Sequence, residues 1–364
     1  MHLALLIYET LETLSGGYLY DRQLTQHLRA NGDKVDIISL PWRNYAAHLS
    51  DNLSFELLHK LQTGGWDALM QDELNHPSLF WLNRRLKAQV DYPILSIVHH
   101  LRASEDHPPL LRRLYRVIER LYLQTIDGFI FNSQTTRAVV SALLGSNTHS
   151  QVAYPAGDRF DPTITETEIC NRSMQPGPLR ILFIGNLIPR KGLHTLLKAV
   201  ELLPPEVEWR LEIAGGHAAN PEYTVQMRAA AQNGGLLPRV EFLGAIPDRE
   251  LADRLRTSQL LVVPSSYEGF GIVYLEGMSF GLPAIAGDQG AASELINPDE
   301  NGFLVTPGDA ENLARLLERL GRDRRLLARL SLGARQRYLQ HPTWTSSMSE
   351  ARAFIHDTIS RNRA

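Results

Sequence analysis

The alternation of short apolar runs with amphipathic segments constrains the fold of this chain more than any other feature. In the first half, the apolar runs are separated by segments of helical periodicity such as Tyr18–Ala30, Leu79–Val90 and Leu110–Thr125. The runs themselves are Leu3–Tyr8, Val35–Leu40, Ile94–Val98, Gly128–Phe131 and Val152–Tyr154. This order is typical of a parallel sheet covered by helices. The first half therefore predicts an α/β domain.

The same pattern starts again at Arg180. Its apolar runs are Arg180–Gly185, Trp209–Ala214, Val240–Leu243, Gln259–Pro264, Ala284–Gly287 and Gly302–Val305. Between the two series, Pro155–Pro178 is rich in proline and glycine and has little periodicity, which indicates an interdomain linker. We predict an N-terminal Rossmann-like domain at 1–160 completed by 345–364, a linker at 161–178, and a C-terminal Rossmann-like domain at 179–344. Two doubly wound domains would face each other across a cleft, with ligands beyond the carboxyl ends of the strands.

Composition excludes several classes of protein. A net charge of −3 argues against a generally basic nucleic-acid binder. The single cysteine, Cys170, excludes an intrachain disulfide framework and a cysteine-based zinc site. Leu3–Tyr8 is too short for the apolar core of a signal peptide, and no later stretch approaches the length of a membrane span. We therefore expect a soluble, cytoplasmic protein that does not bind nucleic acid.

The segment Val262–Met278, VVPSSYEGFGIVYLEGM, places two carboxylates around a glycine-bearing loop. The loop Gly269–Gly271 should open a helix at Ile272, whose first-turn N–H groups and dipole can hold an anion. Glu276 is the only charge between Ile272 and Gly287. A buried carboxylate needs donors, and the two hydroxyls of a ribose would supply them. Alternatively, Glu268 favours the helix dipole and Glu276 pairs with an arginine or a backbone N–H.

Two other turns carry candidate binding groups. The turn GNLIPRKG, from Gly185 to Gly192, places Arg190 and Lys191 where a helix begins, a natural clamp for a diphosphate. The alternative is two solvated charges on a surface turn. After the first strand, Ser15, Gly16 and Gly17 form a small-residue turn that could admit a phosphate or an acceptor. That signal is weaker, because the full G-x-G-x-x-G pattern is missing and a glycine pair is often only a turn.

Taken together, these motifs resemble those of the family 4 retaining glycosyltransferases, which have the GT-B fold. The stretch with Glu268 and Glu276 resembles the E-x7-E signature of that family. The resemblance is strong from Arg180 to Pro307 and weak through the first half. It implies a C-terminal helix that crosses back to the N-terminal domain. It also implies transfer of a glycosyl group from a UDP- or GDP-sugar to a hydroxyl acceptor, with retention at the anomeric carbon.

The resemblance assigns roles to individual residues. Arg190 and Lys191 would contact the donor diphosphate, and Glu276 would hold the ribose. Glu268 and the backbone of the following loop would position the sugar. The remaining candidates near the nucleotide or acceptor are Gly16, Gly17, Gly185, Gly216, Gly269, Phe270, Gly271 and Ile272. His99 corresponds to the active-site histidine of the family, whereas His100 stands where an aspartate is usual, which leaves its role in doubt.

The sequence contains no Asp-x-Asp motif, so cationic side chains and helix ends would have to neutralise the diphosphate. We therefore expect no metal and no cofactor other than the donor substrate. Two rival classes share the α/β pattern. A nicotinamide-dependent oxidoreductase should show a complete G-x-G-x-x-G with an acidic residue about 20 positions later, which this chain lacks. A non-catalytic nucleotide-sugar-binding protein should tolerate loss of Arg190 and Lys191.

The segment Leu110–Gln124 bears on the acceptor. Its apolar residues suggest one helical stripe, composed of Leu111, Leu114, Tyr115, Ile118, Leu121 and Tyr122. Arg112, Arg116 and Arg120 recur at four-residue spacing beside it. A basic amphipathic helix could contact a membrane peripherally and present a lipid acceptor. We favour a domain helix that buries this stripe under the sheet, and a small-molecule or saccharide acceptor.

Overall fold

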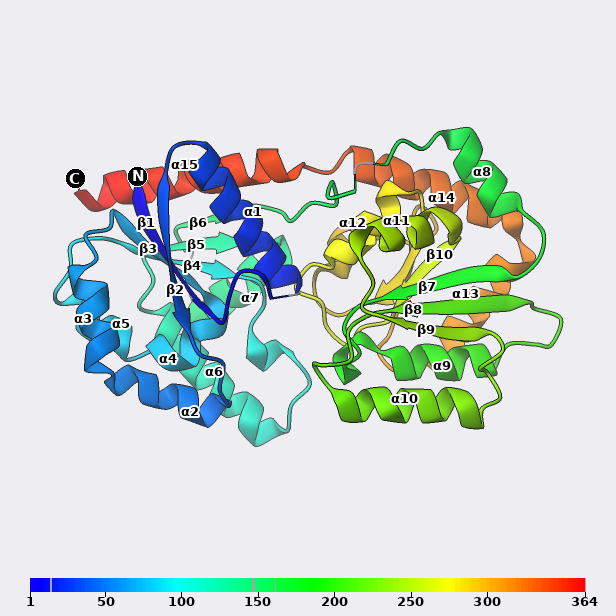
Figure 1. The fold of residues 1–364 in the computed structure, drawn as a ribbon, viewed down its shortest axis with the longest axis horizontal. Helices are drawn as coiled ribbons and strands as arrows, with labels where there is room; N and C mark the ends of the chain where they lie inside the picture. The colour runs from blue at the N-terminus through cyan, green and yellow to red at the C-terminus, as the bar shows by residue number, and fades with distance from the viewer. Residues whose placement is uncertain (14, 146–147, 161, 364) are drawn as a thin grey trace. The chain divides into compact units, whose positions relative to one another are not determined.

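The structure is a computed structural model that describes residues 1–13, 15–145, 148–160 and 162–363 (Figure 1). The chain divides into two units, Met1–Pro155 with Pro342–Ala364, and Ala156–His341. Within the described residues, each unit contains a six-stranded sheet whose paired strands are all parallel. The predicted fold class, two Rossmann-like α/β domains, is confirmed.

The first unit has the strand order β2-β1-β3-β4-β5-β6. Its strands are β1 (His2–Tyr8), β2 (Lys34–Leu40), β3 (Ala68–Asp72), β4 (Ile94–Val98), β5 (Gly128–Phe131) and β6 (Ser150–Val152). The central strands are buried on both faces, and Leu3 to Ile7 are fully buried. The strand order changes direction between β1 and β3, so the loops after these two strands diverge at the switch point where ligands of such sheets bind.

Helices and short 3-10 turns connect these strands. The helices are α1 (Gly16–Ala30), α2 (Tyr45–Leu49), α3 (Phe55–Thr63), α4 (His76–Leu79), α5 (Leu82–Lys87), α6 (Pro109–Leu123), α7 (Gln134–Leu144) and α15 (Trp344–Arg363), and the 3-10 turns are η1 (Ser50–Leu53), η2 (Glu73–Asn75) and η3 (Arg102–Ser104). Serine side chains cap α1, α3 and α7 by accepting a first-turn N–H. The last helix, α15, packs against α1, β5 and β6 (Figure 1), which confirms the predicted return of the C-terminal helix to the first unit.

Strand β3 is the strand that the apolar pattern did not predict. Its sequence, ALMQD, has only three apolar residues before Gln71 and Asp72, yet all five residues are buried. The amide of Gln71 is satisfied by a reciprocal pair of hydrogen bonds with Asn83 of α5, at 2.9 and 3.0 Å. Buried polar groups that find partners of this kind can lie in a central strand. The pattern search missed β3 because it relied on apolar residues alone.

The second unit has the order β12-β11-β10-β7-β8-β9, which is the 3-2-1-4-5-6 order of Rossmann domains viewed from the other edge. Its strands are β7 (Leu179–Ile184), β8 (Trp209–Ala214), β9 (Val240–Gly244), β10 (Leu260–Val263), β11 (Ala284–Gly287) and β12 (Gly302–Val305). Its helices are α8 (Glu166–Met174), α9 (Leu193–Glu201), α10 (Pro221–Asn233), α11 (Asp248–Thr257), α12 (Ile272–Ser279), α13 (Ala310–Arg322) and α14 (Arg324–Leu339), with 3-10 turns η4 (Pro189–Lys191) and η5 (Ala291–Glu294). Across the described residues of both units, we find no helix with the length and apolar character needed to span a bilayer.

The prediction of a linker at 161–178 is wrong for most of that segment. Asp161 lies outside the described residues, but α8 occupies Glu166–Met174 and packs against α14 within the second unit. Thr165 and Glu168 form a capping box that starts the helix. The guanidinium of Arg172, which is 8% exposed, donates to the carbonyls of Phe280 and Gly281 at 2.8 Å each. Buried hydrogen bonds, rather than apolar periodicity, fix this helix.

Replacing Arg172 by alanine should therefore destabilise the second unit. The change removes charged donors from two buried carbonyls, and we expect a loss of about 2–4 kcal/mol in the free energy of unfolding. Arg325→Ala, at an exposed position of α14, is the control and should stay within about 0.5 kcal/mol of the parent. Urea denaturation followed by circular dichroism measures both. Equal stability of the two variants would contradict the anchoring role of Arg172.

Candidate functional site

The main candidate site of the second unit lies where the strand order reverses. Strands β7 and β10 are neighbours, and the loops after them start the two connections that leave the sheet in opposite directions. The loop after β7 carries Arg190 and Lys191, and the loop after β10 carries Glu268. The backbone N–H of Ser266 donates to the carbonyl of Arg190 at 2.8 Å, which joins the two loops. Two motifs far apart in the sequence are thus side by side.

Glu268 is the centre of a buried ion pair. Its carboxylate accepts from the ammonium of Lys191 and from the hydroxyl of Ser265, both at Oε1 and both at 2.6 Å. Arg190 Nη1 lies 3.7 Å from the other oxygen, Oε2, and donates to the carbonyl of Tyr267 at 2.7 Å. The side chain of Glu268 is only 7% exposed. The sequence predicted each of these charged residues at the site, but not that the carboxylate would bind both cations.

The electrostatics of this pair leave the site positive. Burial alone would raise the pKa of Glu268, but Lys191 and Arg190, together with the hydrogen bonds from Lys191 and Ser265, lower it to about 2. Burial lowers the pKa of Lys191, and Glu268 opposes that shift. Glu268 is therefore ionised at neutral pH. With Arg190 and Lys191 protonated, two positive charges against one negative charge leave a net charge of +1, which favours an anion.

Two helix N-termini begin beside this ion pair. Gly192 precedes α9 with φ 71° and Gly271 precedes α12 with φ 93°, both in the left-handed region. A Cβ at Gly192 would lie 2.1 Å from the carbonyl oxygen of Pro264, so only glycine allows this approach. A glycine N-cap contributes no side-chain oxygen, unlike the serines that cap α1 and α7. An anion can therefore take the place of the missing cap.

The other predicted residues of this unit have different surroundings. A Cβ at Gly216 would lie 3.1 Å from Oδ1 of Asn186, the residue that follows Gly185, so Gly216 lies beside the loop after β7. A Cβ at Gly185 itself would be 3.4 Å from the side chain of Lys191. Phe270 is 3% exposed and its ring lies 5.7 Å from that of His341, so its side chain packs inward. Gly269 and Ile272 contribute the adjoining backbone.

Glu276, on α12, has a protein partner that the sequence did not identify. Arg159 Nη2 lies 3.0 Å from Glu276 Oε1. Of the two interpretations that the sequence left open, this contact corresponds to pairing with an arginine. Burial raises the pKa of Glu276, and Arg159 opposes that shift. Arg159 reaches α12 because Gly157 packs on the helix backbone, where a Cβ would lie 2.7 Å from the carbonyl carbon of Leu275. The sequence pattern places this segment at the end of the first domain and therefore does not indicate Arg159 as the partner of Glu276.

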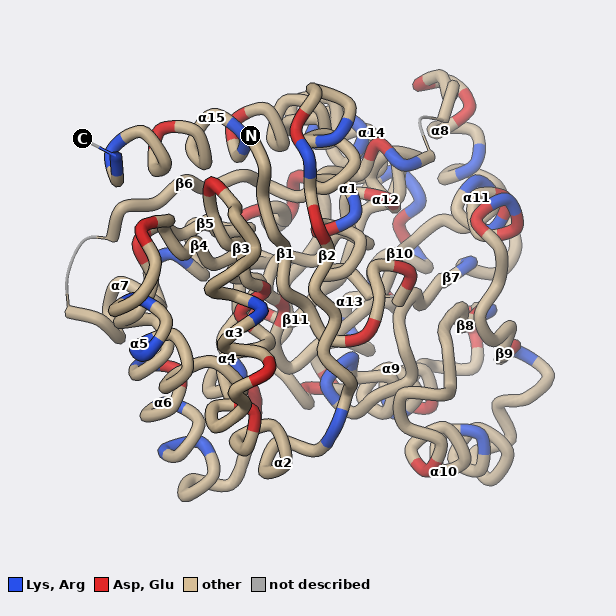
Figure 2. Tube along the Cα trace, turned by 60° about the vertical axis from the view of Figure 1, so that its left-hand side comes forward, with Lys and Arg blue, Asp and Glu red and all other residues tan. Residues whose placement is uncertain are grey.

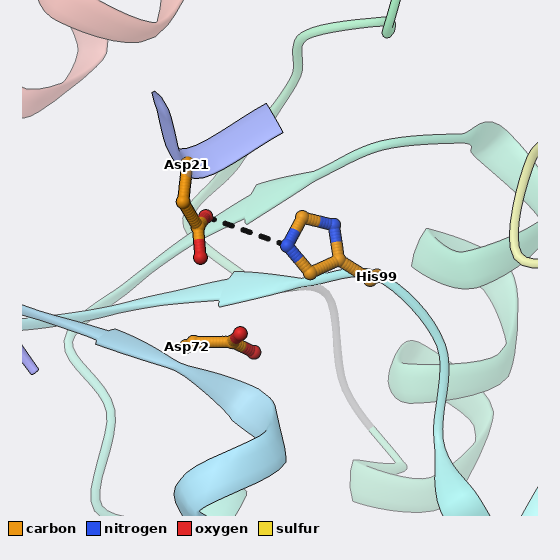
Figure 3. Close-up of side chains that lie close together, drawn as sticks. All are labelled: Asp21, Asp72 and His99. Atoms are coloured by element: carbon orange, nitrogen blue, oxygen red, sulfur yellow. Dashed lines mark ion pairs between the residues drawn. The ribbon is translucent and has the colours of Figure 1, made fainter. Parts of the chain in front are cut away.

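In the first unit, His99 follows β4 and lies against two aspartates (Figure 3). Its Nε2 is 3.4 Å from Oδ1 of Asp21, which belongs to α1, and Asp72 at the end of β3 completes the group. A Cβ at Gly17 would be 3.1 Å from the His99 ring, so the predicted Gly17 and His99 do meet, while Gly16 begins α1. Asp21 and Asp72 are buried and were not predicted.

The pKa values of both Asp72 and His99 are raised above their usual values. Burial, with a contribution from Asp21, raises the pKa of Asp72 to about 7. Burial alone would lower the pKa of His99, but Asp21, Asp72 and Glu73 raise it above its usual value. These carboxylates therefore stabilise the cationic form of His99.

A second cluster of buried titratable side chains consists of Glu73, His76 and Glu119. One of them, His76, lines a pocket of about 450 Å³ in the same unit. Burial raises the pKa of both Glu73 and Glu119 to about 8 and lowers that of His76 to about 4, so all three favour their neutral forms. The guanidinium of Arg102 lies 5.5 Å from the ring of Tyr45 and 4.9 Å from that of Tyr115. The pocket is lined by Tyr8, Trp42, Arg43, Asn44, Tyr45, His48, Leu74, His76, Pro77 and Arg102.

Two sets of side chains among the described residues could coordinate a metal ion. They are Asp21, Asp72 and His99, and Glu73, His76 and Glu119, and in each set the ligand atoms lie within 4.8 Å of one another. Metal ligands must be deprotonated, whereas burial favours protonated Asp72, Glu73 and Glu119. A metal would therefore have to displace protons that these sites hold near neutral pH.

Comparison with known proteins agrees with this architecture. Residues 167–337 match the family model "Glycosyl transferases group 1". The chain is 28% identical to a D-inositol 3-phosphate glycosyltransferase of Rhodococcus erythropolis, over 69% of this chain and 58% of that protein. Sucrose-phosphate synthase from Thermosynechococcus elongatus has the same fold, with a TM-score of 0.82, 21% identity and 99% of each chain covered. Anabaena HepE, solved with UDP and glucose, gives a TM-score of 0.78 at 19% identity, over 98% of this chain and 100% of that one.

Residues 167–337, which lie within the second unit, thus resemble the Glycosyl transferases group 1 domain, and the arrangement of the chain as two Rossmann-like units is the fold of these GT-B neighbours. The chain spans less than two thirds of the Rhodococcus protein that it matches. The matched region, 167–337, contains Arg190, Lys191, Glu268 and Glu276, whereas His99 and the pocket lie outside it.

The Lys191–Glu268 pair generates a prediction for a double-mutant cycle. Lys191→Met leaves the buried carboxylate with the neutral Ser265 hydroxyl and the more distant cation of Arg190. We expect a loss of about 3 kcal/mol or more in the free energy of unfolding. The double variant Lys191→Met/Glu268→Gln should be less destabilised than the sum of the two single variants by at least about 1 kcal/mol. Urea denaturation at neutral pH measures all four proteins. Additive losses would show that the two side chains do not depend on each other.

Acid titration provides a second readout of the same cycle. Because the pKa of Glu268 is lowered to about 2, its stabilisation is present at neutral pH and is lost as the pH falls from the ordinary glutamate value towards 2. Glu268→Gln should lose this part of the acid dependence and keep the rest.

Proposed function

We propose that this chain is a cytoplasmic, retaining glycosyltransferase of the family 4 type. It would move a sugar from a UDP- or GDP-sugar to a hydroxyl acceptor, without a metal ion. The observation that carries this proposal is the site between β7 and β10, where Arg190 and Lys191 lie beside two helices with glycine N-caps. A diphosphate carries the charge and the acceptor oxygens that such a site binds.

The reaction places negative charge on the leaving group. The bond from the anomeric carbon to the diphosphate breaks, the bond to the acceptor oxygen forms on the same face, and the acceptor proton passes to the departing phosphate oxygen. Arg190 and Lys191 would stabilise the charge that develops on this oxygen. Glu268, ionised at neutral pH, would keep Lys191 protonated and in place, while the backbone of Gly269–Gly271 positions the sugar ring.

Glu276 would bind the ribose of the nucleotide. Its carboxylate is buried, and Arg159 Nη2 lies 3.0 Å from Oε1. A diol can donate to a carboxylate of this kind with both hydroxyls. Arg159 would then act as a positioning residue that holds the carboxylate in the orientation required by the ribose.

The acceptor would bind to the first unit. His99 and Gly17 lie at its switch point, and the pocket beside Arg102 combines aromatic rings with a guanidinium. Aromatic faces pack against sugar rings, and arginine suits a phosphate or carboxylate. The Rhodococcus relative is named for an acceptor that is a phosphorylated polyol. A saccharide or small polyol is therefore the acceptor class that we propose. The alternative is a nucleotide-sugar-binding protein of the same fold without catalysis.

Turnover should depend on the cations and not on a metal. Arg190→Ala should lower turnover by about 10²–10³, the usual scale for loss of one electrostatic stabiliser of the transition state. Arg210→Ala, at an exposed position of β8, is the control. Nucleoside-diphosphate release from a panel of nucleotide sugars, with and without EDTA, measures both effects. Loss of activity on chelation that returns with magnesium or manganese would exclude the metal-independent reaction.

Donor affinity should depend on Glu276. Glu276→Gln removes a charged acceptor from the ribose hydroxyls, and we expect binding to weaken by about 1.5–3 kcal/mol. Calorimetric titration with the nucleoside diphosphate measures the affinity, and a melting curve of the free protein measures its stability. Unchanged affinity with a lower melting temperature would mean that Glu276 serves only to bind Arg159.

A further inference from the structure

Helix α6 carries two apolar stripes rather than the single one that the sequence suggested. One stripe is buried in the first unit and includes Tyr115, Ile118 and Tyr122. The other faces solvent: Leu110 is 82% exposed, Leu114 46% and Val117 52%. Leu111, which the sequence pattern places in the buried stripe together with Leu114, is 44% exposed. The prediction that the apolar residues of this segment form one buried stripe is therefore wrong.

The exposed stripe has helical spacing of its own. Leu110, Leu114, Val117 and the half-buried Leu121 follow one another at four-, three- and four-residue intervals. At about 100° per residue they lie within an arc of about 60°. The packing of α6 onto α4, α7 and η3 leaves Leu110, Leu114 and Val117 exposed. The fold of the first unit thus does not account for this stripe, which we call the outer stripe.

Arginines lie beside the outer stripe at exposed positions of α6. Figure 2 marks the Lys and Arg positions in blue along the trace of this helix. Arg112, Arg113, Arg116 and Arg120 are all exposed, and none forms an ion pair with any described residue. The only acid of the helix, Glu119, points inward, where it accepts from the backbone N–H of Ala103 at 3.2 Å. Burial raises the pKa of Glu119 to about 8. The exposed surface of α6 therefore carries four positive charges and no negative one.

We infer that α6 binds the surface of an anionic lipid bilayer through its outer stripe and these arginines. Leucine and valine side chains enter the boundary between headgroups and acyl chains, and guanidinium groups bind the lipid phosphates beside them. Charge complementarity selects this occupant. A nucleic acid would bind the arginines but would leave the leucines in water, and it would not require the outer stripe.

The position of α6 relates this surface to the pocket of the same unit. Tyr115 projects from the buried side of α6 to Arg102, which lines the pocket. A bilayer bound to the outer side of α6 would thus lie across one helix from Arg102. If the proposed transferase function holds, the acceptor class becomes a saccharide or polyol headgroup carried at the membrane surface. The membrane contact itself does not depend on that function.

Vesicle flotation of the full chain tests the inference. We expect the protein to float with vesicles that contain anionic phosphatidylglycerol, and to float much less with phosphatidylcholine alone. Arg112→Glu/Arg116→Glu should weaken binding by at least about 25-fold, since one basic residue near an anionic surface contributes about fivefold. Leu114→Ser/Val117→Ser should also weaken binding strongly, although it changes no charge. Circular dichroism confirms that each exposed substitution leaves the fold intact.

Arg325→Glu/Arg329→Glu is the matched control. These two arginines are exposed on α14 with the same four-residue spacing, and the variant makes the same change in net charge. It should float as the parent does. The inference is overturned if the parent does not float with anionic vesicles, or if the α14 variant loses as much binding as the α6 variant. It is also overturned if Leu114→Ser/Val117→Ser binds normally, because the contact would then be only electrostatic. Flotation requires no donor, so a protein without transferase activity would still answer the question.

Discussion

The buried ion pair between Lys191 and Glu268 is the interaction on which the site of the second unit depends. Each residue follows a different strand, and the two loops meet only because β7 and β10 are neighbours in the sheet. The pair is stable in a buried setting because Ser265 and Arg190 satisfy the carboxylate further. The reversal of strand order thus brings the charges together, and the charges in turn fix the loops that precede α9 and α12.

In both units, charged side chains gather at the point where the strand order of the sheet reverses, but the chemical groups differ. In the second unit, cations and glycine N-caps gather at the switch point between β7 and β10. In the first unit, the corresponding place between β1 and β3 holds Asp21, Asp72 and His99, with Gly17 allowing the histidine ring to approach. The site of the second unit therefore favours an anion, whereas burial in the first unit favours the protonated form of Asp72. Such a division would suit the proposed reaction, in which a charged donor meets a neutral hydroxyl.

The sequence predicted the apolar and glycine-dependent parts of the structure well. The buried strands, the loop of Gly269–Gly271 and the returning C-terminal helix follow from periodicity or from the family resemblance. The missed parts are those in which polar residues are buried: β3 with Gln71 and Asp72, α8 with Arg172, and the partner of Glu276, Arg159. Whether a polar side chain can be buried depends on partners distant in the sequence, which no local pattern contains. The same limit explains why α6 was given one apolar stripe, because exposure cannot be read from hydropathy.

The close packing of Gly157 on α12 has a consequence for building chimeric proteins. A Cβ at this position would lie 2.7 Å from the carbonyl carbon of Leu275, and two residues later Arg159 reaches Glu276. The first residues of the second unit are thus matched to the helix that bears Glu276. A chimera that combines this second unit with the first unit of a relative would have to place its junction before Ala156. A junction after Arg159 would pair α12 with a foreign segment and separate Glu276 from its own partner.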